Sequence, residues 1–167
     1  LDLSKIESNT MEFNFCNISL HQVLNEIGSA QRMNMKKGVE LLLDLPGQEI
    51  TIATDPTRLS QIINNLVNNA IKFTSEGNIR IGYRPATSNR VKIFVEDTGT
   101  GMAKEVIEHI FDRFYKGDAF KQGTGLGLAI CRSIVDSHHG KIWLTSEEGE
   151  GTRAFVYLPL QKEEGMP

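Results

Sequence analysis

The stretch between residues 55 and 73 carries a row of polar side chains that could do chemistry. Five of them recur at intervals of three and four, the spacing of one helix face: Arg58, Gln61, Asn65, Asn69 and Lys72. A face that meets only solvent would be rich in Glu and Lys. Asn is instead a poor helix former that competes with the backbone for hydrogen bonds. The row is therefore either a binding face rich in amides or the plain polar side of an amphipathic helix.

A second group of candidate residues is the motif DTGTGM at 97–102. An apolar run ends at Asp97, and Gly99 and Gly101 follow it. A buried carboxylate must accept hydrogen bonds, for which the exocyclic amine of adenine is a suitable donor. Glycine lets a backbone approach a flat ligand closely. A β-turn after a strand, with Asp as its turn former, explains the same residues.

A third group is a glycine run that opens an apolar helix ending near His138. Its residues are Gly123, Thr124, Gly125, Leu126, Gly127 and Leu128. Unpaired N–H groups and the helix dipole attract phosphate to a helix start. The run is neither the dinucleotide GxGxxG, because Leu128 replaces the third glycine, nor a P-loop. A flexible linker before a helix is the alternative.

Two basic residues, Arg113 and Lys116, lie among the aromatic residues Phe111 and Phe114. The aromatic rings could anchor a loop while the cations reach phosphate groups. A hydrophobic helix end with solvated charges explains these residues too, and it is the simpler interpretation of this segment alone.

Hydrophobic periodicity indicates the elements that must position these residues. The 55–73 helix has a broad apolar stripe, Asp55 as its N-cap and Pro56 at its first position. Further helices are expected at 20–36, 106–114 and 126–138. Strands are expected at 11–18, 39–43, 49–53, 78–83, 91–95, 141–145 and 154–158. This order predicts an α+β fold, a two-layer sandwich whose mixed, mostly antiparallel sheet packs on about three helices.

Composition excludes several classes of protein. The net charge is −3 and no basic stripe is visible, which argues against nucleic acid as a direct partner. Cys16 and Cys131 are far apart, so we expect small buried side chains and not metal ligands. The sequence has no apolar run of membrane-spanning length and no signal peptide. Because it begins with Leu1, we expect a piece of a longer protein.

Together, the motifs resemble the ATP-binding catalytic domain of bacterial sensor histidine kinases, in the superfamily of gyrase-type topoisomerases and heat-shock chaperone ATPases. Their order is an NxxxNAxK helix, a DxGxG strand end, FxxF and GxGxGL. The resemblance implies a Bergerat-type ATP-binding domain over residues 11–162. Residues 1–10 resemble the tail of an upstream dimerisation and phosphoacceptor helix, and 163–167 are expected to be a disordered tail.

The resemblance also implies roles for individual residues. Asn69 would coordinate Mg²⁺ at the phosphates of ATP, and Asn65 and Lys72 would be the catalytic pair. Asp97 would accept from the adenine amine. The remaining ATP-binding residues would be Phe73, Gly99, Gly101, Met102, Arg113, Lys116, the six residues of the glycine run and Thr152. Residues 116–122 would form a mobile lid.

Asn65 stands where the water-using ATPases of this superfamily carry a Glu that acts as general base. An amide cannot accept the proton, so the resemblance implies slow hydrolysis and transfer of the γ-phosphoryl group to a histidine. None of the chain's histidines lies in an H-[ED]-x-x-x-P box. The acceptor would then belong to an upstream domain. An ATP hydrolase of the same fold and a non-catalytic nucleotide sensor are the alternatives.

The expected partners are that upstream dimerisation and phosphoacceptor domain and the receiver domain of a response regulator. The chain alone is expected to be monomeric. The resemblance implies a cytoplasmic domain whose parent protein is anchored in the inner membrane through parts outside this sequence.

Overall fold

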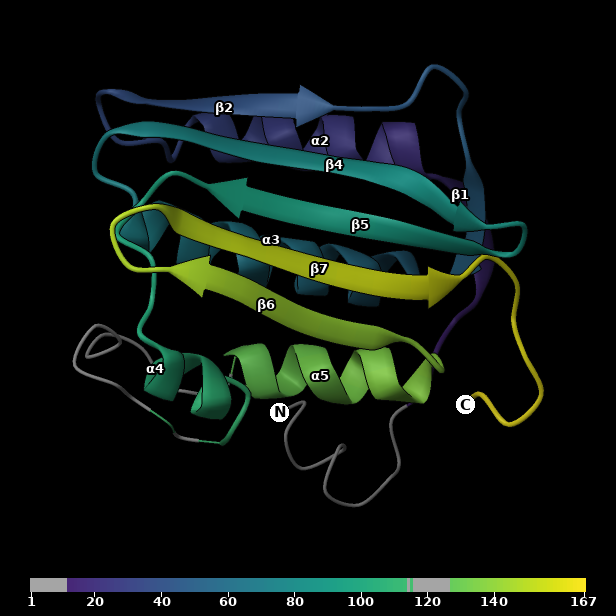
Figure 1. Cartoon of the computed structure of the whole chain (residues 1–167). Coiled ribbons are helices and arrows are strands. Elements are labelled where there is room, and N and C mark those ends of the chain that lie inside the picture. Colours follow the sequence, from purple (N-terminus) through teal and green to yellow (C-terminus); the bar gives the residue numbers. More distant parts are fainter. Residues whose placement is uncertain (1–11, 114, 116–126) are drawn as a thin grey trace.

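The computed structural model describes residues 12–113, 115 and 127–167. In chain order, the elements are β1 (Cys16–Ser19), α2 (Leu20–Arg32), β2 (Val39–Asp44), β3 (Thr51–Thr54), α3 (Pro56–Phe73), β4 (Gly77–Thr87), β5 (Arg90–Asp97), α4 (Lys104–His109), α5 (Gly127–Ser137), β6 (Lys141–Glu147) and β7 (Gly151–Pro159). The helices α2, α3 and α5 lie on one side of a five-stranded sheet (Figure 1). The predicted two-layer α+β fold is confirmed.

The large sheet has the strand order β2-β4-β5-β7-β6, and a small sheet pairs β1 with β3. Only the β2–β4 pair of the large sheet is parallel, so the sheet is mixed and mostly antiparallel, as expected. Within it, Thr152 of β7 is the register partner of both Asp97 on β5 and Ser146 on β6. The register therefore brings three polar residues from distant parts of the sequence into one row.

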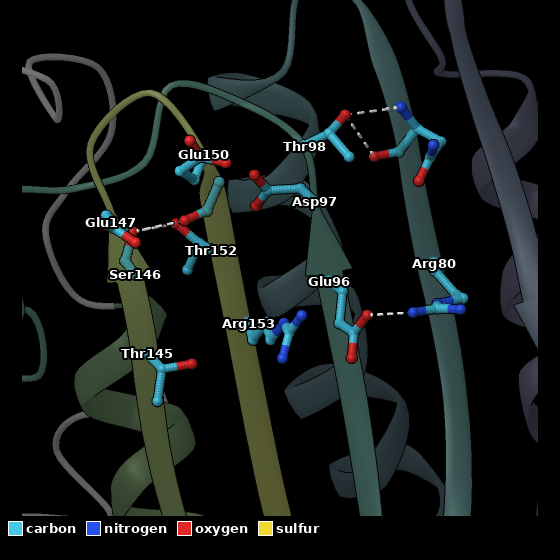
Figure 2. A pocket seen from close by; sticks show the side chains of 12 residues that line it. Arg80, Glu96, Asp97, Thr98, Thr145, Ser146, Glu147, Glu150, Thr152 and Arg153 are labelled. Carbon is cyan, nitrogen blue, oxygen red and sulfur yellow. Dashed lines mark hydrogen bonds and ion pairs between the residues drawn. The ribbon is translucent and has the colours of Figure 1, made fainter.

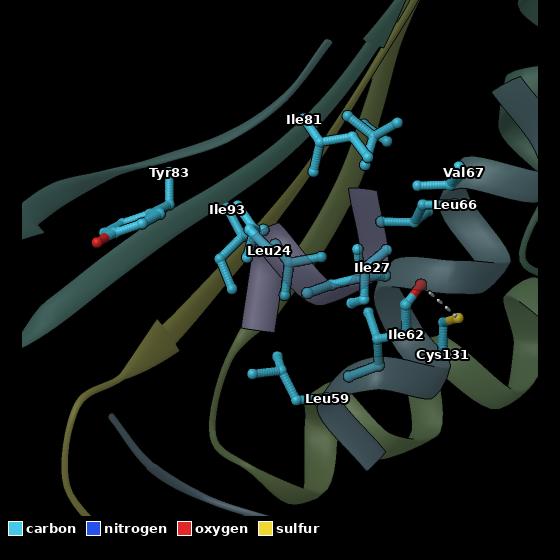
Figure 3. Packing of buried hydrophobic residues seen from close by; sticks show 14 of the residues in the cluster. Leu24, Ile27, Leu59, Ile62, Leu66, Val67, Ile81, Tyr83, Ile93 and Cys131 are labelled. Atoms are coloured by element: carbon cyan, nitrogen blue, oxygen red, sulfur yellow. Dashed lines mark hydrogen bonds between the residues drawn. The ribbon is translucent and has the colours of Figure 1, made fainter. Parts of the chain in front are cut away.

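Helix α3 forms where its sequence predicts and lies at the centre of the core. The Asp55 side chain accepts from the backbone N–H groups of Thr57 and Arg58 at 2.9 and 3.2 Å, which satisfies two donors at the helix start. Its buried face consists of Leu59, Ile62, Ile63, Leu66, Val67 and Ala70. Figure 3 shows Leu59, Ile62, Leu66 and Val67 packed against α2 and the inner face of the sheet. Each large side chain so buried contributes about 1.5–3 kcal/mol, which holds the opposite, polar face in a fixed position.

Several predicted boundaries differ from those of the structure. Within the described part of the expected 11–18 strand, residues 12–15 have no regular structure and the strand is Cys16–Ser19. Phe13 instead packs its ring on His138, with the ring centroids 4.5 Å apart. Helix α2 ends at Arg32, four residues before the predicted end. Strand β4 extends to Thr87, four residues past its expected end at residue 83, because β5 continues to pair with it past a β-bulge.

The C-terminal residues and Cys16 differ from what the sequence led us to expect. We expected a disordered tail at 163–167, whereas Met166 is buried and the Glu163 carboxylate accepts from Arg90 at 3.5 Å. Cys131 is buried as expected, but Cys16 is exposed. Within the described residues, no helix has the length and apolar character needed to cross a membrane.

Candidate functional site

The polar face of α3 divides between two neighbours. Gln31 of α2 donates to the side-chain oxygen of Asn64 at 2.8 Å, so the side of α3 that carries Asn64 is hydrogen-bonded to α2. Asn65 lies on the other side, where its Nδ2 donates to the carbonyl oxygen of Gly127 at 3.2 Å. Asn69 follows one turn later and lines a pocket. The structure thus separates Asn65 and Asn69 from the other amides of the helix.

The pocket lies between α3 and the end of the sheet. Its lining residues are Leu66, Asn69, Ala70, Phe73, Val95, Asp97, Met102, Leu144, Thr152 and Ala154. Apolar walls with a few polar groups are the usual composition of a small-molecule site. The free volume is about 20 Å³, room for about one water molecule. A flat ring can therefore enter only if side chains such as that of Met102 move aside.

Asp97 provides the carboxylate of this pocket. Its Oδ1 accepts from the backbone N–H of Gly99 at 2.9 Å. Burial raises the pKa of Asp97, and the N–H groups of Gly99 and Thr152 offset part of that rise. A carboxylate that is half-buried and incompletely compensated gains by accepting from a ligand donor.

Thr74, the C-cap residue of α3, was not identified from the sequence. Its hydroxyl lies close enough to the Asp97 carboxylate to lower the pKa of Asp97, although the geometry falls short of a full hydrogen bond. Within the described part of the chain, Thr74 Oγ1 is the buried side-chain oxygen without a partner. Such an orphaned hydroxyl fits a site whose ligand or water would complete its hydrogen bonds. In the sequence, Thr74 directly follows the predicted ATP-binding residues Lys72 and Phe73, and this position could have identified it as a further pocket residue.

Ser146 is a second residue that sequence reasoning missed. Its Oγ accepts from the backbone N–H of Met102 at 2.8 Å and donates to the carbonyl oxygen of Gly151 at 2.9 Å. It also bonds to the hydroxyl of Thr152 at 2.8 Å, next to Asp97 (Figure 2). Ser146 thus ties the loop that carries Met102 to the closing strands. Strand alternation places Ser146 on the inward face beside Leu144. A polar residue at an inward position is unusual, and this pattern could have identified Ser146 from the sequence.

Gly99 and Gly101 allow close backbone packing that the sequence did not predict. A Cβ at Gly99 would overlap the carbonyl oxygen of Phe73. Gly101 has a φ of +69°, and a Cβ there would overlap the carbonyl oxygen of Glu147. These glycines let the 97–102 turn pack on the end of α3 and on the β6–β7 hairpin. They shape the pocket through the backbone.

A wider hollow of about 560 Å³ also borders Asp97 and Thr152, between the side chains on the other face of the sheet (Figure 2). Its lining is charged and polar, and Arg80 and Glu96 pair across it at 2.7 Å. Because an aromatic base needs apolar walls, the narrow pocket is the better candidate.

The remaining predicted residues have varied positions. Phe73 lines the pocket, and Lys72 holds its Nζ 5.7 Å from the Phe73 ring centroid. Leu128 is buried in the core, where it packs α5. Arg113 is exposed. Lys116 and residues 123–126, with the predicted lid at 116–122, lie outside the described residues.

Comparisons with a family model and with individual proteins both point to the same family. Residues 54–162 match the family model described as histidine kinase-, DNA gyrase B-, and HSP90-like ATPase. The sensor protein kinase WalK of Staphylococcus aureus is 34% identical over 168 residues, which cover 96% of this chain and 40% of WalK. The chain therefore spans well under half the length of this curated relative.

Solved structures agree with the sequence match. Full-length ShkA in complex with AMPPNP superposes with a TM-score of 0.89 at 26% identity, over 97% of this chain and 34% of ShkA. The catalytic domain of the histidine kinase ThkA gives a TM-score of 0.79 at 31% identity, over 91% of this chain and 98% of that domain. The chain therefore belongs to the family of histidine kinase-, DNA gyrase B- and HSP90-like ATPases, as its motifs indicated, and its relatives are sensor histidine kinases.

Proposed function

We propose that this domain binds ATP with Mg²⁺ and transfers the γ-phosphoryl group to a histidine of a dimerisation and phosphoacceptor domain in two-component signalling. The observation that carries the proposal is the pocket that joins Asn69 of α3 to Asp97 of β5 across apolar walls. ShkA has been solved in complex with AMPPNP, which is an ATP analogue, and this supports a nucleotide as the ligand.

The residues present fit an adenine nucleotide. Asp97 accepts from the exocyclic amine, and this hydrogen bond compensates a carboxylate whose pKa burial has raised. Thr74 adds a hydroxyl that lacks a partner in the described chain. Phe73 and Met102 supply apolar surface to the base. The selectivity for adenine then comes from one buried acceptor that a guanine carbonyl cannot satisfy.

The metal site would depend mainly on the nucleotide. The described residues contain no cluster of three or more His, Cys, Asp or Glu side chains that could hold an ion. Asn69 offers an amide oxygen, and Mg²⁺ commonly binds through one or two protein oxygens together with phosphates and water. When bound, Mg²⁺ neutralises charge on the transferring phosphoryl group.

The chain's own contribution to the reaction is positioning. Asn69 and Lys72 would hold the phosphates along the polar face of α3. Asn65 cannot accept a proton, so water is not activated and the phosphoryl group waits for a stronger nucleophile. The family's histidine would supply that nucleophile from the upstream domain. ThkA has been solved in complex with the response regulator TrrA, which supports a receiver domain as the next partner. We also propose a cytoplasmic position below a membrane-anchored sensor.

Calorimetric titration with Mg-ATP tests the pocket. Asp97→Ala and Asn69→Ala should each weaken binding roughly 10- to 100-fold, the effect of losing a hydrogen bond to a charged group or a metal ligand. Asp112→Ala removes an exposed carboxylate outside the pocket and is the matched control. Unchanged affinity in both pocket variants would overturn the assignment.

Phosphoryl transfer needs a second experiment. The domain is mixed with γ-labelled ATP and a separate protein that carries the phosphoacceptor histidine helix. We expect label on that histidine and slow phosphate release without it. Rapid release without an acceptor would favour a hydrolase, and binding without transfer to several such acceptors would favour a nucleotide sensor.

A further inference from the structure

Cys131 is a fully buried side chain of α5 that the proposed reaction does not use. Its thiol donates to the carbonyl oxygen of Ile62 at 3.8 Å, an interaction that Figure 3 shows. Its sulfur accepts from Nδ2 of Asn65 at 3.4 Å. The single thiol hydrogen is therefore directed to Ile62, which leaves the sulfur as an acceptor for Asn65.

The side-chain amide of Asn65 has its two donor hydrogens committed to α5. Nδ2 meets the carbonyl oxygen of Gly127 at 3.2 Å and the sulfur of Cys131 at 3.4 Å. If the amide turned over, Oδ1 would face a carbonyl oxygen and a sulfur whose hydrogen is already used. Both hydrogen bonds would be replaced by repulsion between acceptors. The contacts of Asn65 with α5 therefore fix which end of the amide points where.

The orientation leaves Oδ1 as the group that Asn65 can offer. Within the described part of the chain, Oδ1 accepts no hydrogen bond. Asn65 lies one helical turn before Asn69, which lines the pocket, so the two amides lie on the same side of α3. An oxygen there can meet a cation, a metal-bound water or an N–H group, but not a phosphate oxygen.

We infer that Cys131 is a positioning residue that, together with the carbonyl group of Gly127, holds Asn65 with its oxygen toward the nucleotide site. The inference rests on the proposed function and narrows it, because it assigns Asn65 to the hydrated Mg²⁺ and not to the phosphates. It also links α3 to the first residue of α5, so a displacement of Gly127 would release one donor of the Asn65 amide.

The protonation state of Cys131 supports this geometry. Burial raises the pKa of the thiol to about 11. The thiol therefore keeps its hydrogen at neutral pH and continues to donate to Ile62. An ionised thiolate would need its own donors and would disturb the arrangement.

The test uses Cys131→Val, which removes the sulfur acceptor at similar volume, and Cys131→Ser, which restores a donor and an acceptor. Ile134→Val is the control, because Ile134 is equally buried in the same helix. ATP affinity is measured by calorimetry with Mg²⁺ and with EDTA. Cys131→Val should bind Mg-ATP about three- to tenfold more weakly, the effect of one hydrogen bond, with metal-free affinity unchanged. Cys131→Ser should recover part of the loss, and Ile134→Val should match wild type.

A spectroscopic readout on the nucleotide-free domain makes the test independent of activity. The side-chain NH₂ resonances of Asn65 should shift in Cys131→Val and stay in place in Ile134→Val. Unchanged resonances, or an equal loss of affinity with and without Mg²⁺, would overturn the inference while leaving the proposed function intact. Failure of the wild-type chain to bind Mg-ATP would instead overturn the proposed function.

Discussion

At the scale of single residues, Asp97 shows how the candidate pocket opposes stability. The carboxylate is held in a pocket that raises its pKa, so its ionised form is less stable in the folded domain than in the unfolded chain. Its donors, the N–H groups of Gly99 and Thr152, offset only part of the effect of burial. A buried carboxylate with a raised pKa that lowers the stability of the fold is typical of a functional site.

Asp97→Asn should therefore stabilise the domain at neutral pH while it weakens ATP binding. A raised folded-state pKa means that the folded state binds more protons, so the stability of the wild type falls as pH rises from about 3.8 through the raised value. The stability difference between variant and wild type should grow across that window and then level off. Urea unfolding at several pH values measures it, with Asp112→Asn as the exposed control. A difference independent of pH would contradict the explanation.

His138 provides the opposite case. Burial lowers the pKa of His138, and its ring packs on Phe13 and Phe15. Its Nδ1 donates to the carbonyl oxygen of Ile134 at 2.8 Å, and Nε2 lies 3.2 Å from the hydroxyl of Thr54. The buried ring is therefore neutral at pH 7.

Because the folded-state pKa of His138 is lowered, its contribution to stability is present above the ordinary value of 6.5 and is lost as pH falls below it. Asp55 opposes this shift and His139 reinforces it. Thermal unfolding should therefore show a fall in Tm between pH 7.5 and 5.5 that is smaller in His138→Phe. His109→Phe, at an exposed histidine, controls for general titration. Equal falls in wild type and His138→Phe would contradict the assignment.

At the scale of elements, the glycines of the two motifs have different functions. Gly101 lies at positive φ against the backbone of Glu147, so it lets a turn pack on the β6–β7 hairpin. At Gly127, a Cβ would lie 3.8 Å from the side-chain carbon of Asn65, an ordinary contact. The first position is fixed by sterics, whereas the described residues around the start of α5 leave room for a side chain.

Gly101→Ala should therefore destabilise the domain by about 1–3 kcal/mol or more, the cost of a strained backbone conformation. Gly127→Ala should be neutral or stabilising by up to about 1 kcal/mol, because Ala is the better helix former. Urea unfolding compares the two variants with wild type. A loss of stability in Gly127→Ala equal to that in Gly101→Ala would show that the two glycines are under the same steric constraint.

At the scale of the whole molecule, the site depends on the arrangement of α3 over the sheet. The apolar face of α3 fixes the helix on the core, and the polar face then meets α5 and the end of β5. Strand register adds Thr152 and Ser146 beside Asp97. The pocket is thus assembled mainly from α3, β5, β6 and β7, and its lining residues run from Leu66 to Ala154 in the sequence.

The sequence by itself determined the helix at 56–73, the order of elements and the residues Asn69 and Asp97, because period, caps and motif spacing are local properties of the chain. It did not predict the packing roles of Ser146, Thr74 and Cys131, or those of Gly99 and Gly101 in the 97–102 turn. Those roles depend on neighbours that lie far away along the chain: the register of β6 on β7, and the packing of α5 against α3. A side chain's hydrogen-bond partner is decided by which element folds next to it, and only the tertiary structure supplies that neighbour.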